Sequence, residues 1–179
     1  MKKNIVLSLL FFSTVAFAQE KMITKTGKVT FEASVPAFEE VKATNSGVTC
    51  VLNPKTGEIA SLSLMKGYRF KLALMEEHFN ENYIESDSYP KSTFKGKIEN
   101  FDVASLTATP KDYNMKGKIE LHGKSKDITI PAKIRKTDAG IEIVSSFNVN
   151  ANDFGIEIPS VVKSKVSNKV SIKTEFTVK

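Results

Sequence analysis

The sequence predicts an all-β protein, a single antiparallel β-barrel of about eight strands with one amphipathic helix. Three observations support this prediction. Apolar and polar residues alternate with a period of two along most of the chain, which is typical of strands with one buried face. Turn-forming residues separate these alternating runs. One stretch, at about residues 71–83, instead repeats its apolar residues at spacings of three and four, which indicates a helix.

The first eighteen residues have the three parts of a secretory signal peptide. Lysines at positions 2 and 3 precede an apolar run over residues 5–12, and Ala16–Ala18 forms a small-x-small cleavage site. The run is shorter than the ~20 apolar residues of a transmembrane helix. We therefore expect a cleaved signal over residues 1–18, no stable membrane anchor, and a periplasmic or secreted protein. Residues 19–179 contain no linker or repeat, so we expect them to form one domain.

The alternating runs are the expected strands of this domain. They cover residues 28–35, 48–53, 58–64, 94–99, 115–122, 127–134, 141–149 and 170–178. Turn residues at Asn53–Gly57, His122–Lys124 and Thr137–Gly140 join consecutive runs in hairpin order. Eight strands with one apolar face each must either stack as two sheets or close into a barrel. Closure leaves every apolar face pointing into one lumen.

The helical stretch contains Leu72, Met75, Phe79 and Tyr83 on one face. An amphipathic helix between barrel strands caps an open end, plugs the lumen or simply packs on the core, and the spacing does not separate these roles. A second interruption, Ala151–Ser164, contains residues that break regular structure. We expect it to be irregular.

The charge of the chain gives no sign of a nucleic-acid partner. It has 26 Lys and Arg against 20 Asp and Glu, and loss of the two signal lysines leaves 24 − 20 = +4. The lysines alternate with apolar residues along the strands and do not cluster on one element, as a nucleic-acid footprint would require. We therefore expect solvated strand faces.

No arrangement of residues predicts catalysis, a metal site or a cofactor. The two histidines, His78 and His122, lie 44 residues apart and do not have the spacing of zinc ligands. The single cysteine, Cys50, cannot form a disulfide within the chain and lies on the apolar side of an expected strand. We expect it to be buried and unreactive. The sequence therefore predicts a protein that is not an enzyme.

Segments in the last two thirds of the chain resemble the YceI-like family of polyisoprenoid- or lipid-binding proteins. The resemblance begins in residues 75–98, at Met75, His78, Phe79, Tyr89, Pro90, Thr93 and Phe94. The hairpin Gly117–Ile134, the segment Asn152–Ile156 and the closing strand Val166–Val178 follow in the family's order. The first third departs from the pattern, because Gly27–Leu52 contains neither the Trp nor the His that family members usually have there.

The resemblance implies a lipocalin-like barrel whose apolar pore holds a lipid or isoprenoid small molecule. The expected tail-binding residues are apolar positions on the strands and the helix: Phe31, Leu62, Leu64, Met75, Phe79, Phe94, Ile98, Leu121, Ile130, Ile143, Phe147 and Phe176. The expected head-group residues come from the matching segment: His78, Asn82, Tyr83 and Lys91. Periodicity does not tell which of the apolar residues line a pore and which only pack.

The leading hypothesis is an exported, non-enzymatic binding protein that carries or buffers such a molecule. The alternative is a barrel filled by its own side chains that acts as an envelope protein-interaction or stress module. Its working surface would be exposed apolar residues of the second interruption: Phe154, Ile156, Ile158 and Val161. The sequence leaves open whether the protein forms a homodimer.

Overall fold

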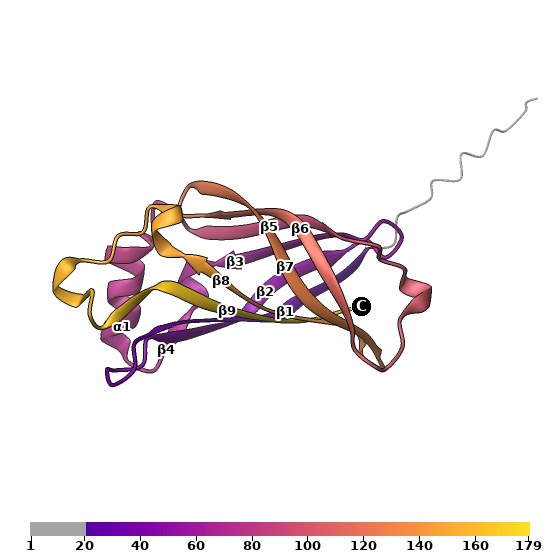
Figure 1. Ribbon diagram of the computed structural model, residues 1–179, viewed down its shortest axis with the longest axis horizontal. Helices are drawn as coiled ribbons and strands as arrows, with labels where there is room; N and C mark the ends of the chain where they lie inside the picture. The colour runs from indigo at the N-terminus through magenta and orange to yellow at the C-terminus, as the bar shows by residue number, and fades with distance from the viewer. Residues whose placement is uncertain (1–20) are drawn as a thin grey trace, which may run out of the picture.

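Eight long strands form a closed antiparallel barrel (Figure 1) in the computed structural model, which describes residues 21–179. The predicted signal peptide lies outside these residues. The barrel strands are β1 (Met22–Ser34), β2 (Lys42–Leu52), β3 (Glu58–Leu64), β5 (Lys91–Ile98), β6 (Lys111–Leu121), β7 (Lys124–Thr137), β8 (Gly140–Asn150) and β9 (Val166–Val178). Neighbouring strands follow the order β1-β9-β8-β7-β6-β5-β3-β2, and pairing of β1 with β2 closes the barrel. The predicted fold class is confirmed.

Each of the eight expected strands is present, and the structure lengthens most of them. β1 begins at Met22, six residues before the expected start, and β9 begins at Val166. A ninth strand, β4 (Arg69–Phe70), pairs with Ala43 and Thr44 of β2. Two residues are too few to show alternation, so the sequence did not predict β4.

The antiparallel order gives the barrel two different ends. At one end, turns join β2 to β3 and β7 to β8, and the loop that contains the 3₁₀ turn η3 (Val103–Ser105) joins β5 to β6. We call this the closed end. At the other end lie the helix, β4 and the irregular segments 35–41 and 151–165 (Figure 1). We call this the mouth end.

Apolar side chains fill the closed end. Leu52, Ile98, Ile134, Ile143 and Val178 come from five different strands and are at most 1% exposed. The loop after β5 covers them with Leu106, which is also buried. This packed layer forms the main core of the barrel.

The helix is shorter than expected and changes type along its length. The expected helix at about 71–83 is an α-helix, α1 (Ala73–His78), followed by one π-helical turn, η2 (Phe79–Tyr83). Nδ2 of Asn80 donates to the carbonyl oxygen of Glu76 at 2.8 Å. In an α-helix that carbonyl would accept the backbone N–H of Asn80, so the side chain competes with the α-helical hydrogen bond.

Two glycines allow β5 and β6 to approach closely. Gly96 and Gly117 are directly opposite each other in the antiparallel pair. A Cβ on Gly96 would lie 2.8 Å from the Phe94 ring and 3.0 Å from Cα of Gly117. Real side-chain atoms do not pack this closely, so only glycine fits this point of the barrel wall.

Candidate ligand-binding cavity

The half of the lumen nearer the mouth end contains a cavity of about 390 Å³. All eight barrel strands contribute to its lining through their inward-facing side chains. The deepest lining residues include Ile59, Met115, Ile130 and Phe176, which lie above the packed layer. This volume is within the range of about 300–1,000 Å³ that is usual for small-molecule sites.

The structure brings eight of the twelve expected tail-binding residues together around this cavity. They are Phe31, Met75, Phe79, Phe94, Leu121, Ile130, Phe147 and Phe176. Ile98 and Ile143 also point inward, but they belong to the packed layer at the closed end and do not line the cavity. Leu62 and Leu64 point outward from β3, and Leu64 is 55% exposed.

Strand register explains why the leucines of β3 face outward. Residues directly opposite each other in an antiparallel pair lie on the same face. Ile59 lies opposite Leu52 on one side and Gly96 on the other, and Leu52 is fully buried. Ile59 therefore points inward, and the period of two turns Ser61 and Ser63 inward with it. The turn after Leu52 could have revealed this orientation from the sequence, because its length fixes Ile59 as the partner of Leu52.

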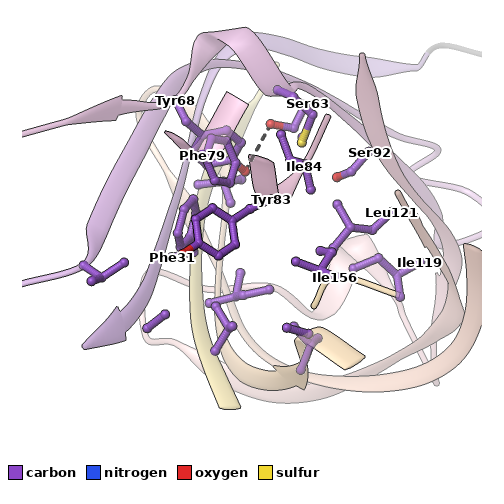
Figure 2. A pocket seen from close by; sticks show the side chains of 18 of the residues that line it. Phe31, Ser63, Tyr68, Phe79, Tyr83, Ile84, Ser92, Ile119, Leu121 and Ile156 are labelled. Carbon is purple, nitrogen blue, oxygen red and sulfur yellow. Dashed lines mark hydrogen bonds between the residues drawn. The ribbon is translucent and has the colours of Figure 1, made fainter. Parts of the chain in front are cut away.

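An aromatic cluster of Phe31, Tyr68, Phe70 and Phe79 forms one wall of the cavity near the mouth. Ring centroids of Phe31 lie 5.2 Å from Phe79 and 5.3 Å from Tyr68. Figure 2 shows Phe31, Tyr68 and Phe79 on one side of the cavity and Leu121 across from them. The cluster packs the helix against β1, so α1 and η2 cover the mouth.

Glu76 holds the helix to β4. Its Oε1 accepts from Arg69 Nη1 at 2.8 Å, and its Oε2 accepts from the backbone N–H of Phe70 at 3.2 Å. Both contacts lie beside the aromatic cluster, because Phe70 belongs to it. β4 thus positions Phe70 and anchors the helix over the lumen.

A buried polar network interrupts the apolar lining. Nδ2 of Asn45 donates to Ser63 Oγ at 3.2 Å, and Ser63 Oγ lies 3.2 Å from Tyr68 OH (Figure 2). Burial raises the pKa of Tyr68 above its usual value, and the hydrogen bond with Ser63 opposes this only in part. Ser61 and Ser92 also line the cavity. Reasoning from the sequence missed these hydroxyl groups because it expected Leu62 and Leu64 of β3 to face the lumen, which places the serines that alternate with them outside.

The expected head-group residues divide into two pairs. His78 and Tyr83 line the cavity at the covering helix. Asn82 and Lys91 are exposed and do not line it. The reason is that Asn82 lies on the outer side of η2 and Lys91 alternates with the inward-facing Ser92 of β5.

His122 joins three segments at the mouth end. Its Nδ1 lies 3.0 Å from the carbonyl oxygen of Phe154, and its Nε2 lies 2.9 Å from Oε2 of Glu85. Its ring also packs on Tyr89, with centroids 4.3 Å apart. These contacts tie the β6–β7 turn to the segment after the helix and to the 3₁₀ turn η4 (Ala151–Phe154). The partners of His122 thus give it a structural role.

The irregular segment 151–165 differs from the surface that the filled-barrel alternative requires. Phe154 is buried, and Ile156 and Ile158 line the cavity. Only Val161 of the four expected residues is a strongly exposed side chain, at 81%. The segment therefore turns most of its apolar residues into the lumen.

Cys50 is buried in the main core, as expected. Burial raises the pKa of its thiol to about 12, so the thiol stays protonated at neutral pH. Within residues 21–179, no three His, Cys, Asp or Glu side chains gather in a group that would hold a metal ion. The same residues include no helix long and apolar enough to span a membrane.

Solved structures similar to this chain share its fold at low sequence identity. A polyisoprenoid binding domain from Saccharophagus degradans, implicated in plant cell wall breakdown, matches with a TM-score of 0.77 and 14% identity, over 89% of this chain and 97% of that domain. BcnA from Burkholderia cenocepacia matches with a TM-score of 0.68 and 16% identity, over 83% of this chain and 94% of BcnA. The YceI protein of Campylobacter jejuni matches with a TM-score of 0.53 and 16% identity, over 100% of this chain and 94% of that protein.

No curated protein matches the sequence. A family model for the YceI-like domain, in contrast, matches residues 12–178 and thus nearly the whole chain. The match extends through the first third, where the sequence departs from the usual pattern of the family. The barrel, its covering helix and this match agree, and the chain belongs to the YceI-like domain family.

Proposed function

We propose that this protein is an exported, non-enzymatic binding protein that holds an apolar or amphipathic molecule, of isoprenoid or lipid type, in the barrel cavity. The main support is the cavity itself, about 390 Å³ of lumen lined mostly by apolar side chains beneath a covering helix. One structural neighbour is a polyisoprenoid binding domain, and this favours the same ligand class here. The signal-like residues 1–18 favour export to the periplasm or beyond.

The cavity is large enough for a buried hydrocarbon chain to contribute a substantial binding free energy. A 150 Å³ apolar cavity holds benzene, which corresponds to about 25 Å³ per carbon. At that density the 390 Å³ cavity accommodates about fifteen carbons. At about 0.8 kcal/mol per buried methylene, they contribute about 12 kcal/mol before the costs of binding are subtracted. We propose that the protein uses this energy to carry or buffer its ligand.

The filled-barrel alternative receives less support. A barrel filled by its own side chains would not leave about 390 Å³ of lumen open. Its proposed interaction surface is also mostly absent, because Phe154 is buried and Ile156 and Ile158 line the cavity. We therefore keep the binding proposal alone.

Native mass spectrometry of the mature protein, purified from its own envelope without detergent, tests the proposal. We expect a discrete mass excess that is extracted into organic solvent as a lipid-like molecule. The same spectrum reports the mass of the mature chain, which tests cleavage after Ala18, and shows whether the protein is a monomer or a homodimer. A ligand-free mass that persists after incubation with long-chain alcohols and polyprenols would contradict the proposal.

A further inference from the structure

Two buried hydroxyl groups at the mouth end of the cavity have more protons to donate than hydrogen-bond acceptors to receive them. The side chains of Ser63 and Tyr68 are 6% and 5% exposed, and both line the cavity. Their oxygen atoms lie 3.2 Å apart, within hydrogen-bond distance. Each hydroxyl has one proton to donate, and the bond between them uses one of the two.

The orientation of the Asn45 amide prevents it from accepting the other proton. Its Oδ1 accepts from the backbone N–H of Gly47 at 2.9 Å, and its Nδ2 donates to the carbonyl oxygen of Leu64 at 2.9 Å. The group that faces Ser63 is therefore the donor Nδ2, at 3.2 Å. Within the described residues 21–179, these are the hydrogen bonds of the two hydroxyls. Among these residues, one hydroxyl proton has no acceptor, whichever way the Ser63–Tyr68 bond points.

An unmatched donor in an apolar site costs free energy until an acceptor arrives. The phenol of Tyr68 is a donor at neutral pH, and burial raises its pKa further above the usual value. The pair lies beneath the covering helix, where the Phe79 ring packs 5.9 Å from the ring of Tyr68. Because both residues line the cavity, an acceptor atom of a bound ligand can reach the pair.

We infer that the ligand supplies an uncharged hydrogen-bond acceptor, such as the carbonyl oxygen of a ketone, ester or amide, to the Ser63–Tyr68 pair. The inference rests on the proposed function and names the chemistry of the ligand's polar end. Within residues 21–179, the ionisable side chains that line the cavity, apart from Tyr68 and Tyr83, are Glu39, His78 and Lys165, and all three are exposed. A carboxylate or phosphate bound at the pair would lose its hydration without a buried cation to replace it.

Three ligands with the same tail and different ends test this inference. They are 2-pentadecanone, pentadecane and pentadecanoate, each used to displace a fluorescent apolar probe from ligand-stripped protein at pH 7.5. We expect the ketone to bind about tenfold more tightly than the hydrocarbon, because it satisfies the free donor. We expect the carboxylate to bind at least tenfold more weakly than the ketone.

Variants of the pair give a sharper test, because proton counting predicts a non-additive result. Tyr68→Phe and Ser63→Ala each remove one hydroxyl and also the bond between them, so each leaves one free hydroxyl donor at the cavity and part of the preference for the ketone. Ser63→Ala also frees one Nδ2 proton of Asn45, but Asn45 does not line the cavity. The double variant removes both hydroxyls of the pair, and we expect its ketone-to-hydrocarbon ratio to fall below that of either single variant, because a carbonyl oxygen buried there has lost both donors. Tyr113→Phe is the matched control: its hydroxyl is also buried without a partner, but it does not line the cavity, so the ratio should not change.

The outcomes separate this inference from the proposed function. Equal affinity of the wild-type protein for ketone and hydrocarbon would overturn the inference and leave apolar binding in place. Tightest binding of the carboxylate would overturn it in favour of a charged end. Failure of all three ligands to displace the probe would overturn both. Circular dichroism of each variant confirms that its barrel is folded.

Discussion

Affinity for a series of linear alcohols should rise with chain length and then stop rising at a length that the cavity sets. The volume of about 390 Å³ accommodates about fifteen carbons at about 25 Å³ per carbon. Below that length each added methylene is removed from water, which contributes about 0.8 kcal/mol, or about fourfold in Kd. Above that length the added carbons remain at the mouth in water and contribute little.

A substitution that fills the cavity should move this limit. Ser61→Leu adds two non-hydrogen atoms to the side chain, and Ser61 lines the cavity. At about 25 Å³ per atom, the longest fully buried chain should shorten by about two carbons. Ser146→Leu makes the same change on an exposed position of β8 and serves as the control.

The measurement is displacement of a fluorescent apolar probe by alcohols of eight to twenty carbons, delivered from cyclodextrin to ligand-stripped protein. We expect a plateau near fifteen carbons in the wild-type protein and in Ser146→Leu, and near thirteen in Ser61→Leu. Affinity that still rises at twenty carbons would show that the cavity does not limit the ligand. Affinity that is flat from eight carbons onward would show that the tail does not bind in the barrel.

Three further predictions follow from single positions. Phe147→Arg places a charge in the cavity and should abolish ligand retention in native mass spectra. The control Leu64→Arg, on the exposed outer side of β3, should retain the ligand. Retention by a folded Phe147→Arg variant would show that Phe147 is not part of the site. Gly117→Ala should lower the free energy of unfolding by about 1–3 kcal/mol in urea titrations, because its Cβ would overlap the backbone of β5. The control Gly47→Ala should change the free energy of unfolding little, because its Cβ would lie 3.6 Å from its nearest neighbour. Cys50 should resist a thiol reagent at pH 8 in the native protein and react on unfolding, because burial raises its pKa to about 12; rapid native labelling would contradict its burial.

The strands and the helix were readable in the sequence because their signals are local. Alternation with a period of two needs only neighbouring residues, so it identified all eight barrel strands. Eight one-sided strands left two stacked sheets and a closed barrel as alternatives, and the resemblance to the family favoured the barrel. The stripe that includes Met75 and Phe79 identified the helix that covers the mouth. The burial of Cys50 followed from the same alternation.

Some strands, such as β3, have apolar residues on both faces. In these strands, pairing with the neighbouring strands decides which face points inward. In β3 the leucines made Leu62 and Leu64 the expected inward positions, but the partners of Ile59 turn Ser61 and Ser63 into the lumen. A shift of one residue exchanges the two faces of a strand, and the sequence of the strand alone does not set that shift. The tertiary structure therefore decided the polar part of the site.

The sequence by itself determined the eight barrel strands, the helix, their order along the chain and the resemblance to the family, which implies a barrel. Only the tertiary structure decided how the lumen divides into a packed layer around Ile143 and an open cavity above it, and how Phe70 of the two-residue β4 joins the aromatic wall. The physical reason is that a cavity is a property of volume. It depends on which side chains from distant strands meet at the same level of the barrel, and local patterns do not contain that information.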